Sequence, residues 1–167
     1  MILSLTGFMG SGKSCTGRAL AERLGWSFVD LDEYVSAKAG RSIPEIFAEG
    51  GEEAFRALEV QAVEEIIGAK REGNLVLALG GGTLETPRAT DAVLRGTHCI
   101  YLEAEPEFLR RWIEGTEGTR PMLGRGDWEE LLERRRPRYE SAHRKVDASA
   151  EPEKILEEIC SIISEFA

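Results

Sequence analysis

Short apolar runs alternate along the chain with longer stretches in which apolar residues recur every three or four positions. The runs at 2–5, 75–79 and 97–102 suit buried strands, and weaker ones span 26–31 and 145–148. Strands that alternate with helices predict a parallel sheet of about five strands with helices on both faces, a three-layer α/β fold.

The stretches between these runs have a helical period, and glycine or proline marks many of their ends. Gly50 and Gly51 separate two of the helices, and Pro137 is expected to kink or end another. The expected helices span 14–24, 32–39, 42–47, 52–70, 86–94, 106–113, 128–139 and 152–166.

The segment GFMGSGKS, residues 7–14, follows the first strand, opens the first helix and fits the pattern G-x-x-x-x-G-K-[ST]. Glycines in such a loop let successive backbone N–H groups surround a polyphosphate at the positive end of a helix. Lys13 would reach the outer phosphates and Ser14 would bind Mg²⁺. The alternative is a glycine-rich turn with a solvated lysine, but the fixed positions and both flanking elements favour a nucleoside triphosphate site.

Polar and glycine residues also follow other strands at the edge of the sheet where this loop is expected. Asp30 and Asp32 end the second strand at alternate positions, so their side chains should share one side. Gly80, Gly81 and Gly82 follow the third strand, where a ligand could approach the backbone closely or the chain could simply turn sharply. Both groups are expected to face the same crevice as the phosphate loop.

Two basic segments lie late in the chain. Residues 115–128 form a loop rich in Gly, Thr and Arg, which suits a basic lid over phosphates that carries Arg120; a solvated loop is the alternative. The next helix carries the sequence Arg-Arg-Arg-Pro-Arg, ending at Arg138. Charge runs are usually solvated faces, yet the proline should spread these arginines and aim at least one of them inward.

Composition limits the class of protein. A chain of 167 residues with 42% hydrophobic and 31% charged residues is typical of one globular domain. The net charge of −9 gives no general attraction to nucleic acid, so an anionic substrate must be met by local arginines. No apolar run suits a membrane span or a secretory leader, and we expect a cytoplasmic protein. Cys15, Cys99 and Cys160 indicate reduced thiols in or near the core, not a disulfide framework or a metal site.

These features together indicate transfer of a phosphoryl group from a nucleoside triphosphate, or its hydrolysis. A GTP-binding switch would offer an Asn-Lys-x-Asp motif, which the chain lacks. A motor or regulatory ATPase would carry an acidic residue directly after a buried strand, whereas the strand at 75–79 ends in glycines. A small-molecule kinase needs a second site for an acceptor hydroxyl, which the spare carboxylate and the arginines can form.

Six segments of the chain resemble shikimate kinases in order and approximate spacing: GFMGSGKS, VDLDE, SIPEIFAEGGEEAFRALE, LGGGT, TRPML and RRRPRYE. The resemblance covers residues 3–147, and it is specific because many folds share the phosphate loop but not the other segments. It implies the nucleoside-monophosphate-kinase-like fold with strand order 2-3-1-4-5. It also implies ATP-dependent phosphorylation of shikimate at its 3-hydroxyl, a step of aromatic amino-acid biosynthesis.

The resemblance further implies roles for individual residues. Lys13 and Arg120 resemble catalytic groups that contact phosphate oxygens, and Asp32 resembles the residue that binds shikimate hydroxyls and either accepts a proton from the attacking one or orients it. Ser14 and, through water, Asp30 resemble the Mg²⁺ ligands. The nucleotide-binding set is Gly10, Ser11, Gly12, Lys13, Ser14, Cys15, Arg111 and Arg120, and the shikimate-binding set is Asp32, Phe47, Phe55, Arg56, Gly80, Gly81, Gly82 and Arg135.

Arg56 and Arg135 resemble the pair that grips the carboxylate of shikimate, and guanidinium forks suit that planar group. The family often has an adenine-stacking arginine a few residues before the Arg-Pro of the lid. Here Arg110 and Arg111 lie farther ahead, and we choose Arg111.

The expected protein is a single kinase domain over 1–167, with a substrate-binding segment at 32–61 and a lid at 112–127. Its expected cofactors are Mg²⁺ and ATP as co-substrate, and it is expected to act on shikimate as a monomer. One alternative is another small-metabolite kinase on the same fold, distinguished by what the two arginines hold. The other is a nucleotide-dependent binding or regulatory module, which would bind ATP without forming a phosphorylated product.

Overall fold

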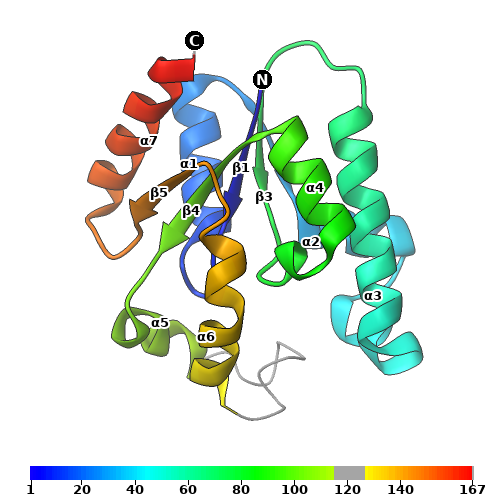
Figure 1. Ribbon diagram of the computed structural model, residues 1–167. Helices are drawn as coiled ribbons and strands as arrows, with labels where there is room; N and C mark the ends of the chain where they lie inside the picture. The colour runs from blue at the N-terminus through cyan, green and yellow to red at the C-terminus, as the bar shows by residue number, and fades with distance from the viewer. Residues whose placement is uncertain (115–126, 167) are drawn as a thin grey trace.

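The computed structural model describes residues 1–114 and 127–166 and contains one parallel sheet between layers of helices (Figure 1). The five strands stand in the order β2-β3-β1-β4-β5, and every neighbouring pair is parallel. The predicted fold class and the strand order implied by the resemblance are therefore confirmed. The strands are β1 (Ile2–Thr6), β2 (Ser27–Asp30), β3 (Leu75–Ala78), β4 (His98–Glu103) and β5 (Arg144–Asp147).

The helices follow the predicted segments closely, with one merger. The segments expected at 42–47 and 52–70 form a single helix, α3, which is interrupted at Gly51, where φ is 72° and ψ is −171°. An L side chain rarely adopts this left-handed conformation, so the predicted glycine break is real. The helices are α1 (Lys13–Leu24), α2 (Leu31–Ala39), α3 (Ile43–Gly68), the short 3₁₀ turn η1 (Thr83–Glu85), α4 (Pro87–Gly96), α5 (Pro106–Ile113), α6 (Trp128–Tyr139) and α7 (Pro152–Phe166).

The core lies on both faces of the sheet because successive side chains on a strand point in opposite directions. On β3, Val76 joins the apolar cluster that contains Leu20 of α1. Its neighbours Leu75 and Leu77 join a second cluster, which contains Val63 of α3. Figure 1 shows α1 behind the sheet and α4 in front of it. The continuous apolar runs of the sequence are thus strands buried on both faces.

The carboxyl ends of the central strands meet at one edge. Asp30 pairs with Ala78, Leu5 pairs with the same Ala78, and Thr6 pairs with Tyr101. The phosphate loop, the start of α2 and the glycine triplet all follow directly from these ends. The fold therefore brings the predicted site segments together, as expected for ligand sites in open α/β sheets.

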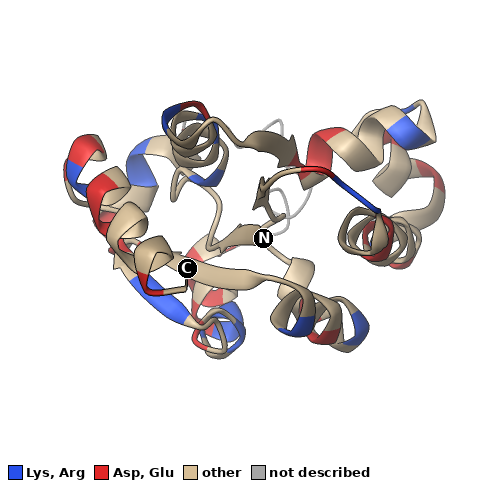
Figure 2. Ribbon diagram, turned by 90° about the horizontal axis from the view of Figure 1, so that it is seen from above, with Lys and Arg blue, Asp and Glu red and all other residues tan. Residues whose placement is uncertain are grey.

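Charged residues are interspersed along the helices, and Figure 2 shows acidic and basic positions side by side on most of them. Neighbouring charges of opposite sign limit the field that any one face presents. None of the helices in the described part of the chain combines the length and the apolar content needed to cross a membrane.

Candidate functional site

A cavity of about 770 Å³ opens at the carboxyl edge of the sheet. Its lining residues come from the phosphate loop, α2, α3, the glycine triplet, α5, α6 and α7. It brings together most of the residues predicted for the site, namely Gly10, Ser11, Gly12, Lys13, Ser14, Cys15, Asp30, Asp32, Phe47, Phe55, Arg56, Gly80, Gly81, Gly82 and Arg135.

Two predicted residues are not part of this lining. Arg111 lines a neighbouring cavity of about 510 Å³, which shares Phe108 and Pro152 with the main one. Arg120 lies at 115–126, outside the described residues, and so does most of the lid expected at 112–127.

The phosphate loop has the backbone conformation that its glycines allow. Gly7, Gly10 and Gly12 all have positive φ, at 150°, 83° and 89°. A Cβ at Gly7 would lie 2.6 Å from the carbonyl oxygen of Leu102, so a side chain cannot fit there without a backbone shift. Glycine is thus needed both for the turn and for the close approach to β4.

The start of α1 offers backbone donors and a cation to the cavity. Gly12 is the N-cap of this helix and provides no side chain to satisfy the first N–H groups. The ammonium group of Lys13 donates to the carbonyl oxygens of Gly7 and Phe8, at 2.7 and 3.0 Å. The lysine is thus folded back over the loop. The N-terminus of a helix without a side-chain cap, together with a lysine, forms an anion site.

Two oxygen-bearing side chains that could bind a metal ion, Ser14 and Asp30, are in contact. Ser14 donates its hydroxyl hydrogen to one oxygen of Asp30, and the other oxygen caps α2 by accepting from the backbone N–H of Glu33 at 3.1 Å. The buried hydroxyl of Ser11 finds no partner among the described residues. A hydroxyl and a carboxylate in contact fit a Mg²⁺ ion, which takes few protein ligands and keeps phosphate and water oxygens.

The sequence pattern placed Asp32 at the end of the second strand, but the structure does not. The strand β2 ends at Asp30, and Asp32 is in the first turn of α2. It nevertheless lines the cavity, because the N-terminal turn of α2 faces the carboxyl edge of the sheet. The shared crevice was predicted correctly, but the local geometry that produces it was not.

The glycine triplet makes room for charged side chains of the protein itself. A Cβ on Gly82 would lie 2.2 Å from Nη2 of Arg56 and 2.9 Å from Nη2 of Arg135. A Cβ on Gly80 would lie 2.8 Å from Oε2 of Glu59 and 3.1 Å from Oδ1 of Asp32. Positive φ is not the reason for these glycines. Side chains from three helices converge on this turn, and a Cβ at Gly80 or Gly82 would force their terminal atoms to move.

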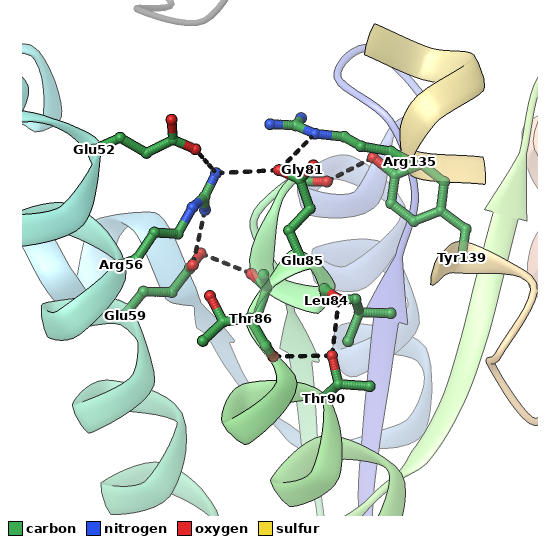
Figure 3. Close-up of polar contacts among 11 residues, drawn as sticks. Glu52, Arg56, Glu59, Gly81, Leu84, Glu85, Thr86, Thr90, Arg135 and Tyr139 are labelled. Atoms are coloured by element: carbon green, nitrogen blue, oxygen red, sulfur yellow. Dashed lines mark hydrogen bonds and ion pairs between the residues drawn. The ribbon is translucent and has the colours of Figure 1, made fainter. Parts of the chain in front are cut away.

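Arg56 and Arg135 approach each other from α3 and α6, and a group of carboxylates holds them (Figure 3). Arg56 donates through Nη1 to Glu59 at 2.8 Å and lies 3.5 Å from Glu52. Arg135 donates through Nε to Oε2 of Glu85 at 3.1 Å. Both predicted arginines are thus in place, from segments of the chain that are far apart.

Nearby carboxylates, one of them buried, determine the electrostatic environment of Arg56. Glu59 is fully buried and also accepts from the hydroxyl of Thr83 at 2.8 Å. Burial acts to lower the pKa of Arg56, but the carboxylates of Glu59, Glu52 and Glu85 together raise it above its ordinary value. The Arg56 guanidinium therefore stays charged at any physiological pH.

Tyr139 ties α6 to the glycine triplet. Its hydroxyl donates to the carbonyl oxygen of Gly81 at 2.5 Å, and the residue is only 1% exposed. Burial raises the pKa of Tyr139, so the phenol stays protonated and keeps donating. The helix α6 continues through Pro137 to Tyr139. Of the arginines on α6, Arg135 points inward, as predicted.

Two groups of apolar residues line the cavity. On the acceptor side the rings of Phe47 and Phe55 lie 5.0 Å apart. Phe108 and Trp112 of α5 and Pro152 of α7 also line the cavity. Trp112 packs against the phosphate loop, since a Cβ on Gly10 would lie 3.0 Å from the Trp112 Cβ.

The thiols are free, and their burial differs from the prediction in one case. Cys99 is buried and Cys160 is partly buried, as expected for core thiols. Cys15, by contrast, is exposed and lines the cavity, because it follows Ser14 in the first turn of α1.

Several residues of the site were not found from the sequence. Glu59 has a weak signal, its i,i+3 spacing from Arg56 on one helix. Glu85 and Tyr139 have no such signal in the sequence, because their partners, Arg135 and Gly81, are distant along the chain and are brought close only by the fold. Trp112 is 59% exposed, and nothing in its local pattern distinguishes it from an ordinary helical residue.

Comparison with known proteins shows the family to which the chain belongs. A model of the shikimate kinase family matches residues 9–164. A shikimate kinase of Thermus thermophilus is 43% identical over 162 residues, which cover 94% of this chain and 86% of the relative. One of Chlorobaculum parvum is 42% identical over 154 residues, which cover 84% and 80%.

The chain belongs to the shikimate kinase family. The solved structure of the shikimate kinase of Acinetobacter baumannii, in complex with shikimate, superposes with a TM-score of 0.89 at 30% identity and covers 98% of this chain and 93% of its own. A gluconokinase of Sinorhizobium meliloti reaches a TM-score of 0.63 at 19% identity, which shows the shared fold alone. Family members are small-molecule kinases that use ATP.

Proposed function

We propose that the protein transfers the γ-phosphoryl group of ATP to the 3-hydroxyl of shikimate and forms shikimate 3-phosphate. The observation that carries this proposal is one cavity that is lined both by the phosphate loop and by Asp32, Arg56 and Arg135. Membership of the shikimate kinase family supports the same reaction.

On the nucleotide side, Lys13 leaves the carbonyl oxygens of the loop and contacts the β- and γ-phosphates of ATP. The N–H groups from Gly10 to Cys15 bind the remaining phosphate oxygens. Ser14 and, through water, Asp30 hold Mg²⁺, and their contact supports this pairing. The ion, when bound, neutralises charge on the transferred phosphoryl group. These residues carry most of the expected transition-state stabilisation.

On the acceptor side, Arg56 and Arg135 hold the carboxylate of shikimate, and Phe47 and Phe55 form an apolar wall against its ring. The backbone of Gly80, Gly81 and Gly82 meets ring hydroxyls. Asp32 binds the attacking hydroxyl, where it either accepts the proton or orients the oxygen toward the γ-phosphate. The convergence of these groups on one turn supports the assignment.

The remaining parts complete the proposal. Arg111 stacks on adenine opposite Pro152, which the neighbouring cavity supports because both residues line it. Arg120, in a lid at 112–127, contacts phosphate oxygens during transfer. The substrate-binding segment is 32–61 of a single domain over 1–167. We also propose a monomer, since one chain supplies both halves of the cavity. As the sequence leads us to expect, we propose that it is cytoplasmic and has no nucleic-acid or membrane partners.

A coupled assay with ATP, Mg²⁺ and shikimate tests the proposal, with gluconate and a nucleoside monophosphate as competing acceptors. We expect turnover with shikimate and little with the methyl ester of shikimate, which lacks the carboxylate charge. Turnover with gluconate or a nucleoside monophosphate, but not with shikimate, would assign a different small-metabolite kinase. Tight ATP binding without any phosphorylated product would indicate a regulatory module.

A further inference from the structure

One carboxylate of the protein contacts both arginines of the acceptor side. Oε2 of Glu85 lies 3.1 Å from Nε of Arg135 and 3.7 Å from Nη2 of Arg56 (Figure 3). Its other oxygen lies 3.7 Å from Nε of Arg134, which is largely exposed. Glu85 thus lies between the two guanidinium groups that would hold the substrate.

The fold fixes this carboxylate where it is. Glu85 ends the 3₁₀ turn η1 directly after the glycine triplet, and its backbone N–H donates to the carbonyl oxygen of Gly82 at 3.0 Å. Its side chain is 23% exposed, so water screens its charge only in part. A short turn that is hydrogen-bonded to the substrate-binding loop therefore keeps a negative charge beside the arginine pair.

The two arginines depend on Glu85 to different degrees. Arg56 has two further carboxylates, with Glu59 at 2.8 Å and Glu52 at 3.5 Å. Arg135 is 1% exposed, and within the described ranges 1–114 and 127–166 Glu85 is its one carboxylate at ion-pair distance. A buried guanidinium needs a partner charge, and Glu85 provides it for Arg135.

We propose that Glu85 is an internal counter-ion of the acceptor-carboxylate subsite, which lowers the affinity of the arginine pair for carboxylates. Glu85 and the substrate carboxylate neutralise the same guanidinium charge, so each weakens the contribution of the other. The partly neutralised pair binds a simple carboxylate poorly. A carboxylate that makes no further contact then binds weakly, whereas an acceptor whose ring hydroxyls add contacts still binds.

The Glu85→Gln variant tests this inference, because glutamine keeps the shape and removes the charge. We expect the Kd and KM for shikimate to fall roughly fivefold, a coupling at the lower end of the usual range between sites. Benzoate, a carboxylate without ring hydroxyls, should inhibit the variant more strongly than the wild type. The empty variant should melt at a lower temperature, and shikimate should raise its Tm more than it raises that of the wild type.

Two further variants make the result decisive. Glu133→Gln removes a carboxylate from an exposed ion pair with Arg136 on the same helix as Arg135, and it should leave the KM for shikimate unchanged. Glu85→Asp keeps the charge but withdraws it by one methylene, so its affinity should lie between those of wild type and Glu85→Gln. If Glu85→Gln does not fold, Glu85→Asp alone carries the test. An unchanged or raised KM in the folded Glu85 variants would overturn the inference.

Since the inference rests on the proposed function, the two failures must be separable. Turnover of shikimate by the wild-type protein tests the function by itself. Turnover together with unchanged affinity in the Glu85 variants would overturn only the role of Glu85. Absence of turnover in the wild type would overturn the function, and an unchanged benzoate affinity in Glu85→Gln would then overturn the counter-ion role as well.

Discussion

The phosphate half of the cavity comes from consecutive residues, 7–14, whereas the acceptor half is assembled from α2, α3, η1 and α6. The first half is mainly a backbone structure, with three glycines of positive φ and the open N-terminus of α1. The second is a structure of side chains, in which arginines and carboxylates from distant segments hold one another. A local motif can therefore bind phosphate in many proteins, while the acceptor half has to be built by the whole fold.

The largest effect is expected in the acceptor half, from Glu59→Ala. The substitution leaves Arg56 without its closest carboxylate and Thr83 without its acceptor, and removing one partner of a buried pair costs about 3–5 kcal/mol of the free energy of unfolding. Urea unfolding measures this change. Glu64→Ala is the matched control on α3, because it breaks only an exposed pair with Arg88, which costs about 1 kcal/mol or less. Similar losses in both variants would show that the acceptor half does not depend on its buried charges.

In the phosphate half, Lys13→Ala should reduce turnover most. Removing a preorganised charge from a phosphoryl-transfer site costs about 3 kcal/mol or more, which is over a hundredfold in kcat. Steady-state kinetics with saturating ATP and shikimate measure it, and Arg18→Ala, an exposed position on the same helix, is the control. Wild-type turnover in Lys13→Ala would refute the assignment of the phosphate loop.

A smaller effect is expected from Arg135→Lys, which keeps the charge and loses the fork that binds a carboxylate through two nitrogens. The KM for shikimate should rise by the equivalent of about 2 kcal/mol, with a lesser change in kcat. Arg138→Lys, an exposed position on the same helix, should change neither constant. An effect confined to the KM for ATP would show that Arg135 acts in the phosphate half and not in the acceptor half.

The smallest of these effects should come from Tyr139→Phe, which removes the bond to Gly81 and keeps the packing. One such hydrogen bond is worth about 1 kcal/mol, and we expect a loss of this size in stability together with a modest rise in the KM for shikimate. Tyr34→Phe, which loses a bond to Glu65 elsewhere, controls for a general effect on stability. A changed kcat with an unchanged KM would show that Tyr139 does not position the acceptor.

The contrast between a local phosphate half and an acceptor half built by the whole fold also explains which features could be predicted from the sequence. The strands follow from short apolar patterns and their order from the resemblance, and the structure confirms both. The phosphate loop also follows from a short pattern, and the binding roles of its residues stay predictions. Arg56 and Arg135 were found through the resemblance, but Glu85 was missed because no local pattern links a residue in η1 to one in α6. Asp32 was assigned to the right crevice for the wrong local reason, since backbone hydrogen bonding ends β2 at Asp30. The adenine-contacting role of Arg111 stays a prediction.

The break at Gly51 has a consequence for the apolar wall of the acceptor pocket. Phe47 and Phe55 are eight residues apart, which in a straight helix would separate them by about 12 Å along the axis. Their rings lie 5.0 Å apart because α3 changes direction at a residue with a φ of 72°. The apolar wall of the acceptor pocket thus depends on the positive φ of one backbone residue, and only an achiral amino acid adopts that conformation without strain.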